Sequence, residues 1–518
     1  MDHTVTISRA PLRLRRGRLA RPVAGVIGLA AILWALINLL AASAPLERTE
    51  LDLDGTPATF TVLPDMPPAP LVVVTHGFAG SRQFMEAFTL TLARSGYAVL
   101  AFDFMGHGRN AQPMGGDVNS IEGTTRMLMD ETARAMSAAR ALPAVDAEQG
   151  VVLLGHSMAT DIITREALRD PDVEAVVGIS MFSQAVTPTE PARLLMVSGA
   201  WEPHLRAFAL EAVRSVAPDA EEGSTAVAGD VVRRAVAAPR TEHVAVLYSG
   251  VTLREARAFI DDTFGRTSTG PILRHGPWVA LLLGGILLLG WPVLSGVAGW
   301  AGARAGYVPA PAPGWRALAV STLVPALMVP IALSFVDVRI LPVLVADYLA
   351  LHMALFGALQ LGLLRAMGHR MPPGPIWPAA VLLLWGIGVF GVAMDQFAAA
   401  FAPNGVRLLV IGAVACGAVP YMLGDAQASA GGRAPLAQRL FLRFGFLVSL
   451  GLAVALDFEG LFFLVIILPV IVLYYLVYGS MGGWVGRRAG PVAAGLGLGL
   501  CLAWALGVSF PLFAGSAG

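Results

Sequence analysis

Long apolar runs alternate with one extended polar stretch along this chain. Because about 20 apolar residues are enough to cross a bilayer as a helix, the runs predict nine transmembrane spans. They cover residues 23–44, 277–299, 316–336, 340–364, 377–397, 407–424, 441–457, 460–478 and 490–513. The pair 441–457 and 460–478, separated by a turn around "DFEG", also fits one bent hairpin or a re-entrant segment.

Between residues 45 and 270 the pattern changes to that of an α/β domain. Short buried-strand runs alternate with helical periodicity, which is typical of a parallel sheet covered on both faces. The predicted strands are 71–76, 97–103, 151–155, 174–180, 193–199 and 231–238, and the predicted helices are 82–95, 120–142, 158–169, 204–216 and 252–264. The chain thus divides into a basic N-terminal segment (1–22), a signal-anchor helix (23–44), the polar domain (45–270) and about eight further transmembrane helices (275–514).

Composition supports a membrane protein, since 56% of residues are hydrophobic and 14% are charged, against roughly 25% charged in an ordinary soluble domain. The net charge is zero, every basic residue is arginine, and no basic run resembles a nucleic-acid footprint. We therefore expect no nucleic-acid partner. Cys416 and Cys501 both lie inside apolar spans, so the polar domain has neither a disulfide nor a cysteine metal site. No metal or cofactor is expected.

Arginine placement orients the spans, because positive residues in short loops stay on the cytoplasmic side of a membrane. Arg9, Arg13, Arg15, Arg16, Arg18 and Arg21 precede the first span and place the N-terminus inside. With alternating spans, the cytoplasmic side also holds Arg304, Arg316, Arg365, Arg370, Arg433, Arg439, Arg443, Arg487 and Arg488. The outer side near the spans holds only Arg274, Arg339 and Arg407, with Asp337, Asp457 and Glu459. The polar domain is therefore predicted outside the cytoplasm, as on the periplasmic side of a bacterial inner membrane.

An alternative makes residues 1–44 a cleaved signal peptide, because "AASA" resembles a small-residue cleavage site. The apolar run is longer than such a signal needs, and Pro45 would follow the cut. Retention of the first span is the favoured interpretation. In both cases the polar domain is exported.

The stretch "LLGHSMAT" (153–160) follows a predicted strand and precedes a predicted helix. It nearly matches G-x-S-x-G, in which a sharp strand-to-helix turn lifts a serine hydroxyl above the sheet. Ala159 stands in place of the second glycine and adds one methyl group to a close contact. The context predicts a nucleophile elbow at Ser157, and the alternative is an ordinary helix N-cap.

A serine nucleophile needs a base to take its proton and an acid to orient that base. In the chain order serine, acid, histidine, Glu202 follows the strand 193–199 and His243 follows the strand 231–238. Each has a simpler interpretation: Glu202 as a helix-start residue favoured by the dipole, and His243 as a surface histidine. Asp219 is a second candidate acid, further from a strand end.

Two further motifs, "THGFAGSRQ" and "DFMGHGRN", follow the first two predicted strands. With "GHSMA" they resemble the α/β-hydrolase superfamily, specifically minimal esterase-like members similar to dienelactone hydrolases, over roughly residues 50–268. The resemblance implies a doubly wound, mostly parallel sheet with a minimal cap. It also implies Ser157 as nucleophile, His243 as general base, Glu202 as orienting acid, and an oxyanion hole at the N–H groups of Phe78 and Met158.

The same motifs contain residues expected to shape the site: His76, Gly77, Asp103, Gly106, His107, Gly108, Gly155 and Ala159. His76, His107 and His156 are interpreted as structural hydrogen-bonding groups rather than catalysts. Only about a dozen residues separate Ser180 from Arg193, which leaves no room for an inserted helical cap. The mouth of the site should be open, for a bulky substrate or for a lid supplied by the lipid surface or by outer loops of the membrane half.

Ionisable residues inside a bilayer are costly and mark functional sites by default. Asp347 and His352 in the fourth span and Asp395 in the fifth suggest a polar cavity under the active site. Hydrogen bonding between helices, with Asp395 at the interface, is the simpler alternative.

The sequence predicts an exported, membrane-anchored serine hydrolase that cleaves carboxylic esters, with a small-molecule or lipid ester as substrate and membrane lipids as partners. One alternative is a polytopic transporter or sensor whose hydrolase-like domain only binds a ligand. Another is acyl transfer to an acceptor other than water, which would use the same residues.

Overall fold

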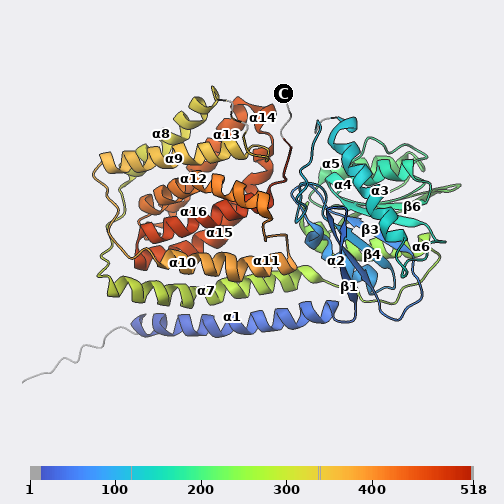
Figure 1. Cartoon of the computed structure of the whole chain (residues 1–518), viewed down its shortest axis with the longest axis horizontal. Helices are drawn as coiled ribbons and strands as arrows, with labels where there is room; N and C mark the ends of the chain where they lie inside the picture. Colours follow the sequence, from blue (N-terminus) through green and yellow to red (C-terminus); the bar gives the residue numbers. More distant parts are fainter. Residues whose placement is uncertain (1–12, 118–119, 337, 339, 515–518) are drawn as a thin grey trace, which may run out of the picture.

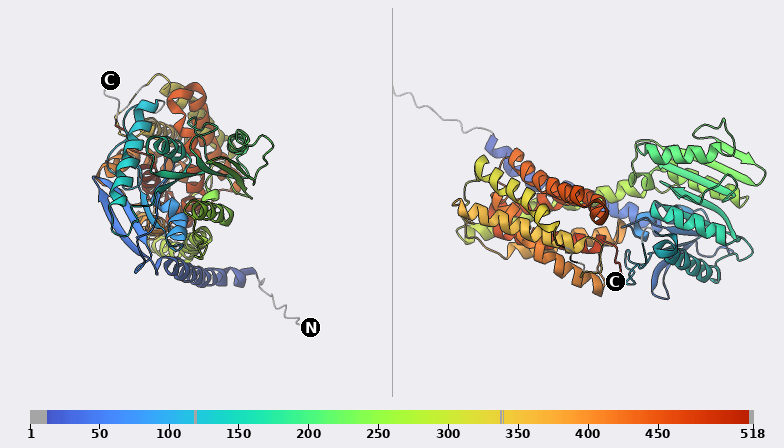
Figure 2. Two further views of the ribbon diagram at one scale, coloured as in Figure 1. Left: turned by 90° about the vertical axis from the view of Figure 1, so that its right-hand side faces the viewer. Right: turned by 90° about the horizontal axis from the view of Figure 1, so that it is seen from above.

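A computed structural model describes residues 13–117, 120–336, 338 and 340–514. Arg9, Asp337 and Arg339, used above for orientation, and most of the segment 1–22 lie outside the described residues. A sheet domain and a bundle of long helices lie end to end (Figure 1). The view from above shows the same arrangement, with the sheet domain at one end of the bundle (Figure 2, right). The polar stretch of the sequence therefore folds apart from the apolar runs.

The described residues form a nine-stranded sheet in the order β1-β2-β4-β3-β5-β6-β7-β9-β8. Its parallel part consists of β4 (Ala98–Phe102), β3 (Leu71–Thr75), β5 (Val151–His156), β6 (Val173–Ile179), β7 (Arg193–Gly199) and β9 (Val231–Ala238). These strands agree with the six predicted ones to within one residue at each end. The pattern of buried runs therefore located every parallel strand.

Both faces of the sheet are covered, because alternate residues of a strand enter different cores. On β3, Val73 packs in one core with α3 (Arg126–Arg140), α4 (Met158–Arg169) and α5 (Pro203–Arg214). Val72 and Val74 pack in the other core with α2 (Glu86–Ala93) and α6 (Gly250–Thr263). A strand buried on both sides needs a continuous apolar run. The predicted doubly wound, mostly parallel α/β fold is confirmed.

Three antiparallel strands were missing from the prediction. β1 (Glu47–Leu53) and β2 (Thr56–Val62) form a hairpin at one edge, and β8 (Thr225–Ala228) pairs with β9 at the other. The outermost strands β1 and β8 are largely exposed, so their residues carry no buried-strand signal. Edge strands of this kind depend on the neighbour that they pair with.

Two helices begin at later residues in the structure than the sequence predicts. The segment 82–95 divides into a 3₁₀ turn, η1 (Arg82–Met85), and α2. The segment 120–142 begins with a π-helical turn, η2 (Ile121–Thr125), in which Gly123 has φ −90° and ψ −121°, and α3 starts only at Arg126. A further 3₁₀ turn, η3 (Ala245–Tyr248), precedes α6.

Nine helices among the described residues are long and apolar enough to cross a membrane, the number that the sequence predicts. They are α1 (Arg13–Ser43), α7 (His275–Arg304), α8 (Trp315–Leu333), α9 (Ala346–Ala366), the segment Pro378–Phe397, α12 (Gly405–Ala428), α13 (Leu436–Leu456), α15 (Phe463–Ala489) and α16 (Pro491–Ser509). The segment Pro378–Phe397 combines α10 (Pro378–Leu383), a π-helical stretch η4 (Leu384–Gly391) and α11 (Val392–Phe397).

Span boundaries differ where the local backbone is not helical. α9 begins at Ala346 rather than at residue 340, because Val345 has a left-handed φ of 57° and Pro342 lacks an N–H group. α13 and α15 are separate long helices joined by one turn, α14 (Phe458–Leu461), which favours two full spans over a re-entrant segment. α15 continues to Ala489, well beyond the predicted end at residue 478.

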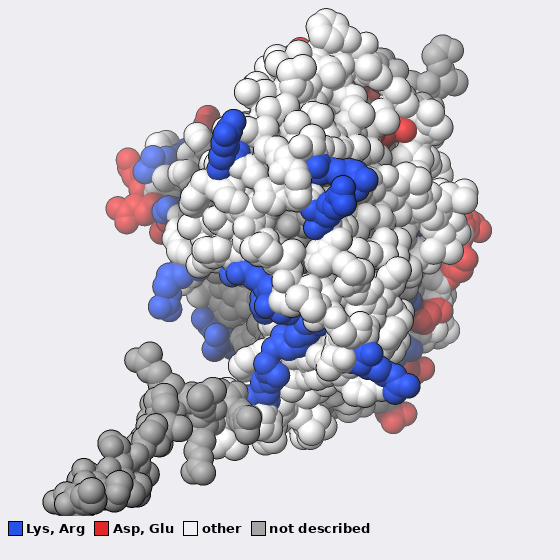
Figure 3. All heavy atoms as spheres, turned by 90° about the vertical axis from the view of Figure 1, so that its left-hand side faces the viewer, with Lys and Arg blue, Asp and Glu red and all other residues white. Residues whose placement is uncertain are grey.

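The far end of the bundle, away from the sheet domain, shows arginines across its surface, with Asp and Glu only toward the margins (Figure 3). The last turns of α7, α9 and α15 contribute Arg304, Arg365, Arg487 and Arg488. α1 packs closely on α7, because a Cβ on Gly28 would lie 2.7 Å from the Leu289 nitrogen. Small residues permit such close helix pairs in membranes.

Candidate active site

Ser157 occupies a tight turn between β5 and α4, with φ 54° and ψ −120°. A residue other than glycine is strained in this region, and such strain gathers at functional sites. The Ser157 side chain does not cap α4, and its Oγ lies 2.8 Å from Nε2 of His243 instead. The N-cap interpretation is therefore wrong, and the turn has the geometry of a nucleophile elbow.

Close packing around the elbow explains its small residues. A Cβ on Gly155 would lie 2.8 Å from Cδ1 of Ile163 and 3.2 Å from Cβ of Ala159. Ala159 is completely buried, so its methyl group occupies space that Gly155 leaves free. A Cβ on Gly77 would lie 2.9 Å from Cβ of Ser157. The loop of the first motif, which contains Gly77, therefore packs directly against the elbow.

Glu202 and His243 lie beside Ser157 in one hydrogen-bonded chain. His243 Nδ1 is 2.6 Å from Glu202 Oε1. The second carboxylate oxygen, Oε2, accepts hydrogen bonds from the Ser180 hydroxyl at 2.7 Å and from the Gly199 N–H at 2.6 Å. These residues come from the carboxyl ends of parallel strands or the loops that follow them, which meet at one edge of the sheet. The structure thus brings together the three residues that the sequence singled out.

The environment of Glu202 keeps its carboxylate ionised. Burial by itself raises the pKa of Glu202, but hydrogen bonds from His243, Ser180 and the Gly199 N–H outweigh burial and hold the pKa below its usual value. An ionised carboxylate favours the tautomer of His243 with the proton on Nδ1, which leaves Nε2 able to accept the Ser157 proton. Asp219, the second candidate acid, lies in an exposed turn after α5, and within the described residues no hydrogen bond joins it to His243.

The two N–H groups expected to form an oxyanion hole lie on either side of the elbow. Phe78 follows Gly77, which touches Ser157, and Met158 is the first residue of α4, where an N–H has no partner inside the helix. In the part of the chain that the structure describes, neither N–H donates a hydrogen bond. Both residues line the same cavity as Ser157. Within the described residues both N–H groups thus lack a hydrogen-bond acceptor, as the donors of an oxyanion hole would.

His76 and His107 hold the motif loops through backbone hydrogen bonds. His76 Nδ1 lies 2.8 Å from the Gly77 carbonyl oxygen, and its Nε2 accepts the Phe104 N–H at 3.1 Å. His107 Nδ1 lies 2.8 Å from the Met105 carbonyl oxygen. Both rings are buried. These contacts are those of structural residues.

His156 precedes the elbow, and its Nε2 lies 2.8 Å from the backbone carbonyl oxygen of His243. Burial lowers the pKa of His156 to about 3, and it also lowers the pKa values of His76 and His107. All three imidazoles are therefore neutral in the folded protein near neutral pH. His156 ties the loop of His243 to the end of β5.

We expect the α/β domain to lose stability in acid because of these three histidines. In the unfolded chain they bind protons near pH 6.5, whereas in the fold they stay neutral, so stability present above about pH 6.5 is lost as the pH falls. Each contributes up to about 1.4 kcal/mol per pH unit in that range. The apparent Tm in detergent, followed by intrinsic fluorescence at constant ionic strength, should fall between about pH 7 and 5.

The matched variant is His156→Gln, whose amide can keep the hydrogen bond to the His243 carbonyl without titrating. Its Tm should fall less steeply with acid than that of the unaltered protein. Identical slopes would contradict the assignment of the acid sensitivity to the buried histidines.

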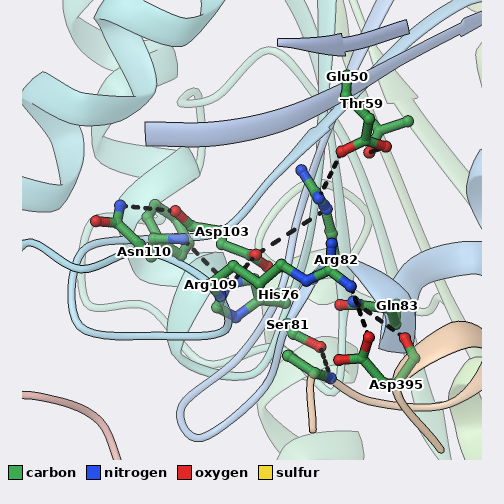
Figure 4. Close-up of polar contacts among 12 residues, drawn as sticks. Glu50, Thr59, His76, Ser81, Arg82, Gln83, Asp103, Arg109, Asn110 and Asp395 are labelled. Atoms are coloured by element: carbon green, nitrogen blue, oxygen red, sulfur yellow. Dashed lines mark hydrogen bonds and ion pairs between the residues drawn. The ribbon is translucent and has the colours of Figure 1, made fainter. Parts of the chain in front are cut away.

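Asp103 joins the two motif loops. Its carboxylate accepts the Arg82 N–H at 2.8 Å and the Arg109 N–H at 3.0 Å (Figure 4). A Cβ on Gly108, which has φ 51°, would lie 2.4 Å from Cγ of Asp103. Glycine at this position allows the second loop to close around the carboxylate.

The helical domain holds the same loops from its side (Figure 4). The Ala400 N–H donates to Ser81 Oγ at 3.1 Å, and Gln83 Nε2 donates to the Asp395 carbonyl oxygen at 3.4 Å. The Arg109 guanidinium forms an ion pair of 2.6 Å with the Asp395 carboxylate. The carboxyl edge of the sheet, where Ser157 lies, therefore faces the helical domain.

The loop after β4 also pairs with the segment that follows α16. The Gly106 carbonyl oxygen accepts the Leu512 N–H at 2.8 Å and the Arg407 guanidinium at 2.8 Å. The Met114 N–H donates to the Leu512 carbonyl oxygen at 3.0 Å. Arg407 is 1% exposed and also donates to the Phe510 carbonyl. Gly106 is thus a contact point between the two domains.

Gly106→Ala is expected to weaken this junction. A Cβ there would lie 2.3 Å from the Leu512 carbonyl oxygen, and a left-handed backbone alone costs alanine roughly 1–2 kcal/mol. The control is Gly265→Ala, which has φ 61° but nothing within 4 Å of its added Cβ. In thermal unfolding in detergent, the melting temperature should fall further for Gly106→Ala than for Gly265→Ala. Equal losses would show that Leu512 does not press on the loop.

Ser157 opens into a cavity of about 520 Å³, a size usual for small-molecule sites. Its apolar lining consists of Phe78, Met114, Ile121, Leu128, Met158, Ile162, Phe182, Leu205 and Phe463, and its polar lining includes Ser120, Thr124, Thr125, Asp161, Arg165 and Gln184. Phe463 is the first residue of α15. The helical domain therefore forms part of the wall that the α/β domain, lacking an inserted cap, leaves open.

The three ionisable residues predicted inside spans occupy separate positions. Asp347, in the first turn of α9, accepts two N–H groups of the preceding loop. His352 is buried, and its Nε2 lies 2.9 Å from Ser449 Oγ of α13. Asp395 pairs with Arg109 at the domain junction. The three residues therefore have separate partners, and the bond between His352 and Ser449 joins two helices, as the alternative expected.

Three further residues complete the site without having been singled out in the sequence. Ser180 directly follows β6, which ends at Ile179, so its position after a buried strand was a usable signal. Arg109 and Phe463 depend on contact between domains, for which the local sequence carries no pattern. In the described part of the chain, no group of three or more His, Cys, Asp or Glu side chains is placed to hold a metal ion.

Residues 66–229 match the family model described as "Serine aminopeptidase, S33". Similar solved structures include TT1662 from Thermus thermophilus, with 18% identity over 43% of this chain and 99% of that chain and a TM-score of 0.32. PA2218 from Pseudomonas aeruginosa, a hypothetical protein, has 14% identity over 43% and 95% and a TM-score of 0.33. E-2-(acetamidomethylene)succinate hydrolase has 16% identity over 42% and 99% and a TM-score of 0.30.

No match was found among curated proteins. The family model covers β3 to β8, the part of the sheet that contains the elbow and the acid. Together with the parallel strand order, this match makes the polar part of the chain a domain of the α/β-hydrolase superfamily, joined to a domain of long apolar helices.

Proposed function

We propose that this protein is a membrane-anchored serine hydrolase that cleaves carboxylic esters through an acyl-enzyme. The observation that carries the proposal is the hydrogen-bonded chain from Ser157 Oγ through His243 to Glu202, with distances of 2.8 Å and 2.6 Å. A neutral serine needs such a base before it can attack a carbonyl carbon. The strained φ of Ser157 supports the same role, because it presents the hydroxyl at the cavity.

In the first half of the reaction, His243 Nε2 takes the Ser157 proton as Oγ forms a bond to the ester carbonyl carbon. The negative charge that develops on the carbonyl oxygen is received by the N–H groups of Phe78 and Met158, each of which contributes typically 10²–10³-fold in such sites. The protonated His243 then gives its proton to the alkoxide leaving group as the ester C–O bond breaks. Glu202 remains ionised and stabilises the imidazolium.

In the second half, water attacks the acyl-enzyme. His243 accepts a proton from that water, and the carboxylic acid product leaves as Ser157 Oγ regains its proton. The cavity walls hold the acyl group during both steps. Ser180 keeps Glu202 in place through the other carboxylate oxygen.

The membrane setting is the second part of the proposal. α1 crosses the bilayer with its N-terminus in the cytoplasm, and the hydrolase domain lies on the outer side. Support comes from the arginines gathered at the end of the bundle away from that domain (Figure 3), as the positive-inside rule requires. An ester of a lipid or a lipid-like molecule is the favoured substrate, because the catalytic edge of the sheet faces the helical domain.

Covalent labelling tests the proposal most directly. The full-length protein in detergent should react with a fluorophosphonate probe, and peptide mass spectrometry should find the label on Ser157 alone. Heat-denatured protein should not react, because activation of the hydroxyl depends on the folded site. Absence of labelling in the native protein, or labelling on a different serine, would refute the proposed chemistry.

A further inference from the structure

The helical domain contributes a residue to the catalytic cavity. Phe463 lines that cavity together with Ser157 and His243. Its ring centroid lies 5.1 Å from that of Phe78, the residue whose N–H is proposed to bind the oxyanion. Phe463 therefore stands at the reacting end of the cavity rather than at a distant wall.

Phe463 is the inner member of a row of three aromatic residues. Phe458 is 60% exposed and Phe462 is 43% exposed, and their ring centroids lie 5.6 Å apart. The centroids of Phe462 and Phe463 lie 6.1 Å apart. The row thus leads, ring by ring, from the outer surface of the helical domain into the catalytic cavity.

The helical backbone is interrupted at these three phenylalanines, between the end of α13 and the start of α15. α13 ends at Leu456, and Asp457 caps the short α14 by accepting the Gly460 N–H at 3.0 Å. α14 has only four residues before α15 begins. This turn follows a membrane-length helix at the end nearest the hydrolase domain (Figure 1). With the proposed orientation, Phe458 and Phe462 are therefore expected at the level of the outer leaflet.

The cavity itself suits an amphiphile. Its lining includes the apolar side chains of Ile121, Leu128 and Phe463, and it also includes Asp161 and Arg165, which form an ion pair of 2.8 Å. A long acyl chain needs a continuous apolar surface, and a polar alcohol moiety needs hydrogen-bonding groups. Both kinds of side chain line the cavity into which Ser157 opens.

Building on the proposed function, we propose that the substrate is a long-chain acyl ester resident in the bilayer. Its chain enters the catalytic cavity sideways from the outer leaflet, along Phe458, Phe462 and Phe463. Phe463 is then a specificity-determining residue that favours bilayer-embedded esters over esters dissolved in water. The helical domain supplies the entry route as well as the anchor.

The test compares two esters of one alcohol in the same proteoliposomes. The full-length protein, in vesicles of phosphatidylcholine and phosphatidylglycerol, is given 4-methylumbelliferyl palmitate in the bilayer or 4-methylumbelliferyl acetate in the water. Phe463→Ser should lower kcat/KM for the palmitate by about ten-fold or more, since burial of one aromatic side chain is worth that much. Hydrolysis of the acetate should fall by a smaller factor, so that the ratio of the two kcat/KM values, palmitate to acetate, drops.

Conservative and remote variants sharpen the result. Phe463→Leu, which stays apolar, should keep most of the palmitate activity, and Phe458→Ser should lower it without touching the catalytic residues. A wild-type protein that cleaves the acetate but not the palmitate, or a Phe463→Ser variant that loses both activities equally, would overturn this inference alone. Loss of both the fluorophosphonate label and all esterase activity in the wild-type protein would overturn the proposed function as well.

Discussion

Replacing Ser157 with alanine is expected to lower kcat for ester hydrolysis by up to about 10⁶-fold, the loss seen when a serine nucleophile is removed from a working triad. The Ser157 hydroxyl contacts His243 and makes no capping bond to α4, so its removal takes away the attacking oxygen and little else. Residual catalysis should come from the oxyanion donors and from binding. Initial rates with a soluble chromogenic ester measure the effect.

A matched control is Ser198→Ala. Ser198 is buried, and among the described residues its hydroxyl has no hydrogen-bond partner. This variant should keep its activity and its melting temperature. If Ser157→Ala retains more than about one hundredth of the wild-type rate, Ser157 is not the nucleophile, because general-base effects alone are worth about 10²–10⁴-fold.

Glu202→Gln should lower kcat by about 10⁴-fold, as expected when an amide replaces the acid that fixes a catalytic histidine. The carboxylate accepts hydrogen bonds on both oxygens, from His243 on one and from Ser180 and the Gly199 N–H on the other. An amide offers one acceptor and one donor, so His243 would be held with the wrong nitrogen protonated. KM should change little, since Glu202 does not line the cavity.

Asp219→Asn is the companion variant, because Asp219 is the second acid that the sequence analysis named as a candidate. It lies in an exposed turn after α5, and its replacement should leave kcat unchanged. A loss of activity in Asp219→Asn together with normal activity in Glu202→Gln would reverse the assignment of the acid.

Much of the α/β domain could be predicted from the sequence, since buried parallel strands impose a local pattern. Runs such as "LVVVT" are apolar because both faces of β3 are covered, and each of these runs was found to within one residue. The edge strands β1 and β8 were missed for the opposite physical reason. An exposed edge strand is stabilised by hydrogen bonds to its neighbour, which no local periodicity records.

The candidate site likewise contains residues that the sequence predicts and residues that it does not. Ser157, Glu202 and His243 each follow a strand, and the carboxyl ends of parallel strands converge, so chain order was enough to bring them together. Ser180 also follows a buried strand, but nothing in the local sequence indicates that its hydroxyl donates to Glu202. The sequence left Asp395 either in an intramembrane cavity or at the interface, and in the structure it pairs with Arg109 of the other domain.

The sequence by itself determined the doubly wound sheet, the nine long apolar helices and the positions of the three residues proposed to carry the chemistry. Each can be predicted from the periodicity or the spacing of a few residues, because burial and backbone geometry act locally. Only the tertiary structure decided that the sheet edge with Ser157 faces the helical domain, that Gly106 and Leu512 join the two domains, and that Phe463 lines the cavity. These contacts join segments hundreds of residues apart, and packing alone brings such segments together.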